Sequence, residues 1–137
     1  MSRRRVIELP NVKHSAPIPA AVLVDNVLAS SALFGADPDT GGLPDRIEDE
    51  VAFLFDNIRG VLDAAGATTD DLLRMDVLLR EGADRAIINQ HWLAMFPEEA
   101  DRPARHITVV ANLPARAQVQ LIAVLAKAPE ERPGHDH

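Results

Sequence analysis

The sequence predicts an α+β fold in which two amphipathic helices cover one face of a β-sheet. Apolar residues recur at three- and four-residue intervals over 47–65 and again over about 84–96, which is typical of helices with one buried side. Short aliphatic and β-branched runs, such as 105–111 and 117–126, are typical of strands. Hydrophobic residues make up 47% of the chain but aromatic residues only 4%, so we expect an aliphatic core between helices and sheet.

The chain length of 137 residues fits one domain, which we place at residues 1–128. The remaining segment, 129–137, is polar and contains two prolines, so we expect it to be a disordered tail. The tail contains two histidines, which could bind a metal ion loosely, but we regard such binding as incidental. We therefore predict neither a metal site nor a cofactor.

The first part of the chain predicts three short strands. Residues 5–9 form the first, which Pro10 ends because proline lacks the N–H that a sheet requires. Residues 20–24 and 27–31 flank Asp25-Asn26, a dipeptide suited to the positive φ of a tight hairpin turn.

The segment 37–48 has two interpretations. Its acidic residues and its glycine at the sixth position resemble a calcium-binding loop, but no helix precedes it and prolines interrupt it. We favour a turn that leads into the first helix, with Asp45 as N-cap and Glu48 completing a capping box. Glu48, Asp49 and Glu50 then stabilise the helix start, and Gly66 ends the helix.

The next segments predict a turn, a strand and a second helix. After a possible short turn over 68–71, residues 73–80 alternate: Met75, Val77 and Leu79 lie on one face, and the other face is polar. The helix over about 84–96 ends before a proline. His91 lies beside its apolar stripe, where a packing or surface role is favoured over a ligand role because no second ligand stands at a suitable spacing.

The last strand predicts an uncovered sheet face. In 117–126, Val119 and Leu121 face one side, whereas Ile122 and Val124 face the other. Two one-sided helices can cover only one face of a sheet, so an apolar patch is left on the opposite face and indicates oligomerisation.

Composition excludes several classes of function. The formal net charge of −7 argues against a nucleic-acid partner, because such binding depends on clustered Lys and Arg. The chain has no cysteine, which removes disulfides, thiolate nucleophiles and zinc–thiolate sites. No apolar run reaches membrane-spanning length and none follows the basic start as a signal peptide would require, so we expect a cytoplasmic protein without a membrane partner.

Arg105 is the candidate binding residue. It stands at the start of a predicted strand, after Arg102-Pro103-Ala104, and its planar guanidinium suits a carboxylate or phosphate. The alternative is a surface arginine whose alkyl stem covers part of the sheet.

The order of segments resembles the RidA (YjgF/YER057c/UK114) family, whose members hydrolyse reactive enamines and imines. The resemblance covers about 16–126 in the family's order. It rests on the segments 26–31, 38–41 with Pro44, 57–66, Asn89, Trp92, 96–97, 102–105 and 113–114.

The resemblance implies a chorismate-mutase-like protomer with one mixed β-sheet and two helices on one face. It also implies a homotrimeric barrel with ligand clefts between neighbouring subunits. In these clefts, Arg105 would bind a small carboxylate, with the Ile107 backbone N–H as a second donor. Asn89 matches a family position on the second helix and is expected to contact the neighbouring subunit or the local backbone.

Four positions depart from typical imine deaminases. Ile18 replaces a tyrosine, Ala32 replaces the glycine after Ser31, Ile107 replaces a cysteine, and Gln120 replaces a glutamate. Glutamine can hold a water molecule but cannot accept its proton, and general acid–base help contributes about 10²–10⁴-fold to rates. Ile18 and Phe34 would make the pocket more apolar.

Two hypotheses follow. The first is a weak or altered-specificity enamine/imine deaminase, a hydrolase with Arg105 as anchor, Gln120 as water holder and Ser31 as a secondary polar contact. Ser31 has no credible histidine base, so a strand-end hydrogen bond is favoured over a nucleophile. The second is a non-catalytic trimer that binds or senses a small carboxylate. Ribonuclease activity ranks last, because the chain is acidic and shows no histidine pair.

Overall fold

The computed structural model describes residues 3–10, 12–14 and 16–126. Its elements, in chain order, are β1 (Arg4–Ile7), β2 (Ala21–Val24), β3 (Val27–Ser30), α1 (Ile47–Ala65), η1 (Thr69–Asp71), β4 (Leu72–Arg80), α2 (Arg85–Met95), η2 (Glu99–Asp101), β5 (Ala104–Val110) and β6 (Ala117–Val124). The α+β class is therefore confirmed.

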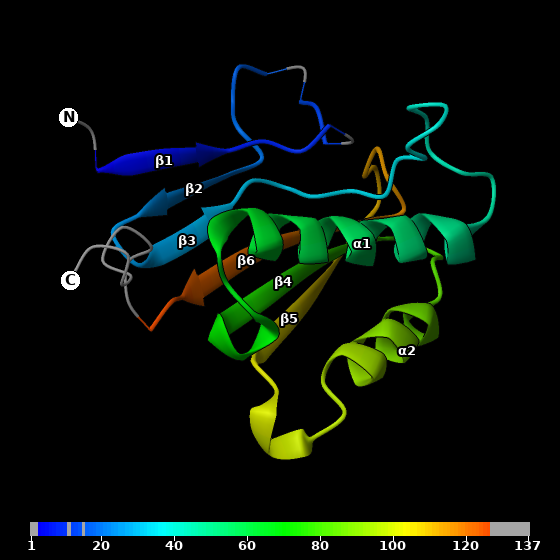
Figure 1. Ribbon diagram of the computed structural model, residues 1–137. Helices are drawn as coiled ribbons and strands as arrows, with labels where there is room; N and C mark the ends of the chain where they lie inside the picture. The colour runs from blue at the N-terminus through cyan, green and yellow to red at the C-terminus, as the bar shows by residue number, and fades with distance from the viewer. Residues whose placement is uncertain (1–2, 11, 15, 127–137) are drawn as a thin grey trace, which may run out of the picture.

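The six strands form one mixed sheet in the order β1-β2-β3-β6-β4-β5. Only β4 and β5 pair in parallel, and α2 provides the crossover between them. Strands β1 and β5 are the edges, and β6 lies between β3 and β4. Figure 1 shows α1 and α2 on the same side of the sheet, as the one-sided helices predicted.

Burial follows the alternation that the sequence predicted. In β4, Met75, Val77 and Leu79 are buried, and the register pairs Met75 and Val77 with Leu121 and Val119 of β6 on the same face. Helix α1 covers this face with Leu54, Phe55, Ile58 and other apolar side chains that are fully buried. The core therefore lies in one layer, between this face and the helices.

The hairpin and the second helix were also predicted correctly. Strands β2 and β3 pair across a turn in which Asp25 has φ 53°, the left-handed conformation expected there. Helix α2 begins after Asp84, whose side chain accepts a hydrogen bond from the Ala86 N–H. His91 is a packing histidine: its ring stacks on Phe55 with centroids 5.0 Å apart, and burial lowers its pKa.

The start of α1 differs from the prediction. The N-cap is Arg46 rather than Asp45, and no side chain caps the helix. The Arg116 guanidinium instead binds the backbone carbonyls of Pro44 and Asp45, which fixes the chain before the helix, so that α1 begins one residue later. The C-terminal end was predicted correctly, with Gly66 in the left-handed conformation.

Glu50 has a different role from the one predicted. It is fully buried, and its Oε1 lies 2.8 Å from Nε of Arg116, while the Arg116 backbone N–H donates to Oε2 at 2.9 Å. A buried carboxylate needs such compensation, because losing its hydration is costly. Glu50 thus joins α1 to the start of β6 and is not simply a complement to the helix terminus.

The other face of the sheet carries no helix. Val27, Ile122 and Val124, adjacent on β3 and β6, have exposed fractions of 44%, 38% and 41%. We call the face that also carries Asp76 and Gln120 the uncovered face. Exposed aliphatic side chains that lie together in this way are typical of an interaction surface.

The predicted disordered tail, 129–137, lies outside the described residues. Within the described ranges, neither helix has the length and apolar character needed to cross a membrane.

The Glu50–Arg116 pair generates a stability prediction. Arg116→Met should lower the free energy of unfolding by about 3–5 kcal/mol, because it leaves the Glu50 carboxylate buried without its cation. Glu48→Gln, which breaks the exposed Arg46–Glu48 pair, should cost no more than about 1 kcal/mol. Urea unfolding of both variants measures the difference, and equal losses would contradict the role assigned to Glu50.

Candidate functional site

Arg105 lies on edge strand β5 and is held by α2. The register pairs it with Met75, so its side chain leaves the sheet on the helix-covered face. Its Nη1 donates to Oδ1 of Asn89 at 2.9 Å, and its Cζ lies 4.8 Å from the centroid of the Trp92 ring. Asn89 and Trp92 are three residues apart and share one side of α2, which places both against the guanidinium.

The guanidinium of Arg105 is restrained but not neutralised. Among the described residues, the ion pairs of the structure involve other arginines, and the hydrogen-bond partner of Arg105 is a neutral amide. Partial burial lowers the pKa of Arg105 and the charge of Arg85 lowers it further, yet a guanidinium stays protonated at neutral pH. Four of its five N–H donors have no partner in the described part of the chain, which suits an anion.

Ile107 follows Arg105 on the same face of β5. It pairs with Val77 in the register and packs against the core, so its side chain is part of the protein interior rather than a ligand contact. The role predicted for Ile107 concerns its backbone N–H on the edge strand, and it stays a prediction.

Gln120 lies on the opposite face of the sheet. It pairs with Asp76, whereas the next residue, Leu121, pairs with Met75 on the covered face. Gln120 is therefore exposed on the uncovered face, and within one protomer the sheet separates it from Arg105. The structure does not bring these two predicted site residues together in a single chain.

Ser31 lies on the Gln120 side of the structure. The pairing of β3 with β6 ends at Ala29 and Ile122, and the next bridge joins Leu33 to Val119 with a register shift of one residue, so Ser31 lies beside the part of β6 that contains Gln120. Its backbone N–H donates to the Ala20 carbonyl, so the chain is held there as a continuation of the strand. The two predicted polar contacts, Ser31 and Gln120, thus belong to one region.

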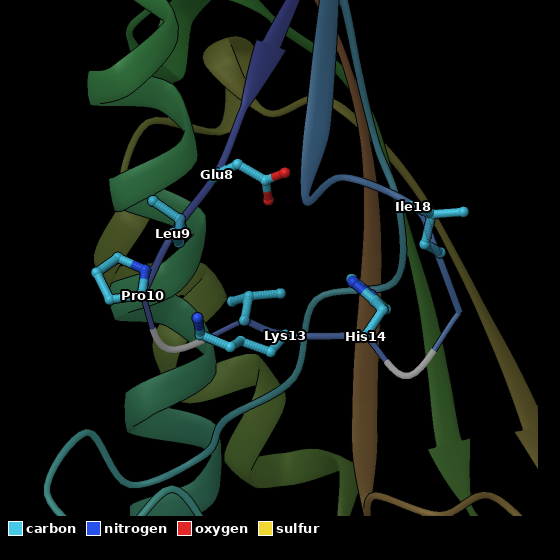
Figure 2. Close-up of a pocket in the computed structure, with 7 residues that line it drawn as sticks. Glu8, Leu9, Pro10, Lys13, His14 and Ile18 are labelled. Carbon is cyan, nitrogen blue, oxygen red and sulfur yellow. The ribbon is translucent and has the colours of Figure 1, made fainter.

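A hollow opens among described residues of the connection between β1 and β2. It has a volume of about 450 Å³, and Figure 2 shows Glu8, Lys13, His14 and Ile18 among the side chains around it. A neighbouring hollow of about 270 Å³ is lined by Lys13, His14, Phe34 and Gln118. Ile18 and Phe34, predicted to make the pocket apolar, therefore each line a hollow, whereas Arg105 lines neither.

His14 links these hollows to the predicted site. Its Nε2 donates to the Ala32 carbonyl oxygen at 2.8 Å, and its ring meets Phe34 edge-on with centroids 5.9 Å apart. Asn57 of α1 donates to the Phe34 carbonyl at 2.8 Å, which fixes the backbone of the same segment. Sequence reasoning missed His14 because the contact joins residues 18 positions apart and leaves no periodic signal.

Metal chemistry has no candidate ligand set here. Across the described ranges, no group of three or more His, Asp or Glu side chains is placed to hold a metal ion. The calcium interpretation of 37–48 gains no support from this arrangement, in which Asp37 instead accepts a hydrogen bond from the Asp39 N–H.

Comparisons with known proteins agree with the architecture. A family model described as Endoribonuclease L-PSP matches residues 11–127. The 2-iminobutanoate/2-iminopropanoate deaminase of Escherichia coli K12 is 27% identical over 112 residues, which cover 81% of this chain and 88% of that protein. A RutC family protein of Aquifex aeolicus is 26% identical over 117 residues, covering 82% of this chain and 94% of the relative.

Solved structures show the same fold. RidA from an Antarctic Psychrobacter superposes with a TM-score of 0.79 at 27% identity, covering 88% of this chain and 99% of that one. TdcF of E. coli with bound serine gives a TM-score of 0.78 at 25% identity, covering 89% and 99%. The strand order, the two helices on one face and the match over residues 11–127 together show that this chain belongs to the Endoribonuclease L-PSP family, the RidA/YjgF family.

Proposed function

We propose that the protein is an imine deaminase that hydrolyses a small enamine or imine carboxylate to a keto acid and ammonia. The observation that carries this proposal is the Arg105 guanidinium, which is oriented by Asn89 and Trp92 but has no carboxylate partner in the described structure. Relatives that are 2-iminobutanoate/2-iminopropanoate deaminases support the substrate class.

Arg105 would bind the substrate carboxylate. A guanidinium can donate two parallel hydrogen bonds to a carboxylate, which fixes both the position and the orientation of a small 2-imino acid. The Ile107 N–H on the same edge strand is a further donor. The solved structure of TdcF contains bound serine, a small amino acid that carries a carboxylate as a 2-imino acid does. This supports a small carboxylate as the ligand.

The proposed cleft requires two copies of the chain. Arg105 and Gln120 leave the sheet on opposite faces, so one substrate molecule can meet both only if they come from different protomers. The exposed aliphatic side chains of the uncovered face supply a reason for the copies to associate. We therefore propose a homotrimer with the substrate at its subunit interfaces.

The remaining residues would shape the second side of the cleft. Gln120 holds the attacking water through its amide, and Ser31 offers a further polar contact. Ile18, Ala32 and Phe34 form apolar walls beside the hollows described above. Asn89 acts as a positioning residue, because its contact is with the Arg105 guanidinium.

Imine hydrolysis suits a site of this kind. Water adds to the imine carbon while the nitrogen gains a proton, giving a carbinolamine. The carbon–nitrogen bond then breaks, ammonia leaves and the keto acid remains. Because the carbon is already electrophilic, holding the carboxylate and the water in the correct geometry provides much of the rate enhancement.

The first prediction of the proposed function concerns Arg105. Arg105→Ala should reduce kcat/KM for freshly generated 2-iminopropanoate by about 100-fold or more, mainly through KM, because the loss of a charge-assisted hydrogen-bonding pair costs about 3 kcal/mol. Ammonia release, corrected for the spontaneous rate in buffer, measures this. Arg105→Lys should recover only part of the loss, since an ammonium is a point charge without the planar fork.

Arg59→Ala is the matched control for this experiment. Arg59 is an exposed arginine of α1 that pairs with Asp56 one turn away, so its loss should leave the rate unchanged. Buffer-level rates for the wild-type protein would refute the deaminase proposal. If the wild-type protein then still bound pyruvate in an Arg105-dependent manner, the function would be that of a non-catalytic carboxylate-binding protein.

The second prediction concerns assembly. The purified protein should have the mass of a trimer by light scattering at micromolar concentration. Val124→Asp should shift it toward the monomer, because it places a charge within the uncovered apolar face. Leu93→Asp, at an apolar position on α2 that is 52% exposed against 41% for Val124, should leave the trimer intact. A monomeric wild-type protein would refute the inter-subunit cleft.

A further inference from the structure

Asp76 is the single carboxylate within the six described strands. It lies in the middle of β4 on the uncovered face, where it pairs with Gln120 of β6 on one side and with His106 of β5 on the other. Directly opposite residues on neighbouring strands have Cβ atoms about 4.5–5.5 Å apart, so these three side chains form a continuous polar row.

The Asp76 carboxylate is accessible and has one oriented contact. Nε of Arg74 donates to Oδ1 at 2.7 Å, and 34% of the Asp76 side chain is exposed. This contact uses one oxygen, which leaves Oδ2 for another donor. The row therefore presents an amide, a carboxylate and an imidazole toward the same side of the sheet.

Gln120 alone leaves the proposed reaction incomplete. When water adds to an imine carbon, the oxygen must lose a proton, and an amide cannot accept it at neutral pH. A water held by Gln120 would lie beside the side chain that stands opposite Gln120 on β4. That side chain is Asp76, because the two residues are directly paired.

We propose that Asp76 is the proton acceptor for the attacking water, which is held between its carboxylate and the Gln120 amide. This inference rests on the proposed deaminase function and on the inter-subunit cleft. Arg74 is the positioning residue for Asp76.

The step balances without any further reactant. The carbon–oxygen bond forms as one water proton passes to Asp76 and the imine π electrons move to nitrogen, and Asp76 then gives this proton to the nitrogen, which yields the carbinolamine. In the second half, Asp76 takes the carbinolamine hydroxyl proton as the carbon–oxygen double bond forms and the carbon–nitrogen bond breaks, and it passes this proton to the nitrogen, which leaves as ammonia. The net reaction is imine plus water to ketone plus ammonia, and Asp76 ends ionised as it began.

The test removes the carboxylate from β4 and then places one at the paired position on β6. Asp76→Asn should lower kcat for 2-iminopropanoate hydrolysis by about 100-fold while KM changes little, within the range of general-base effects. The double variant Asp76→Asn/Gln120→Glu moves the carboxylate one strand over and should restore kcat to within about tenfold of wild type. Asp70→Asn, at an exposed acid in η1, is the matched control.

A purely structural Asp76 predicts a different pattern. If it only pairs with Arg74, Asp76→Asn should lower the melting temperature or the trimer mass without a separate loss of kcat, and the double variant should not regain activity. Either a wild-type kcat for Asp76→Asn or a folded, trimeric but inactive double variant overturns the inference. Should Asp76→Asn fail to fold, Asp76→Ser replaces it in both the single and the double variant, with the same expected results.

The same experiment separates this inference from the function on which it rests. If the wild-type protein hydrolyses the imine and Arg105→Ala abolishes this, while Asp76→Asn behaves like Asp70→Asn, the deaminase proposal stands and only the role of Asp76 is wrong. If the wild-type protein shows no hydrolysis above buffer, both proposals fail.

Discussion

The difference between the two faces of the sheet determines where the candidate site residues lie. Helices α1 and α2 bury one face against an aliphatic core, and the opposite face keeps exposed aliphatic side chains on β3 and β6. Because side chains alternate along a strand, this division also separates the polar residues. Arg105 leaves the sheet on the covered face and Gln120 on the uncovered one, so a site that used both residues would need two protomers.

Local signals made the elements predictable. The periodicity of α1, Gly66 at its end and the Asp25 turn each act over a few residues, and the structure has all three where they were expected. The start of α1 was predicted incorrectly because a partner 70 residues away decides it. Arg116 binds the carbonyls before the helix and pairs with Glu50, and neither contact leaves a pattern in the sequence.

The candidate site residues could be proposed from the sequence, but their arrangement in space could not. Arg105 was identified from its chemistry and from family resemblance, and the structure adds the two α2 side chains that orient it. Which face each residue occupies depends on the register between β4, β5 and β6, strands that are far apart in the chain. His14 was missed for the same reason, since only the folded chain brings it to Ala32.

The parallel pairing of β4 with β5 limits where residues can be inserted into the chain or deleted from it. Parallel neighbours need a long connection, and here α2 supplies it while also carrying Asn89 and Trp92. An inserted or deleted residue in α2 would rotate both side chains by about 100° about the helix axis and remove the support of the guanidinium. Insertions and deletions should therefore be excluded from this crossover.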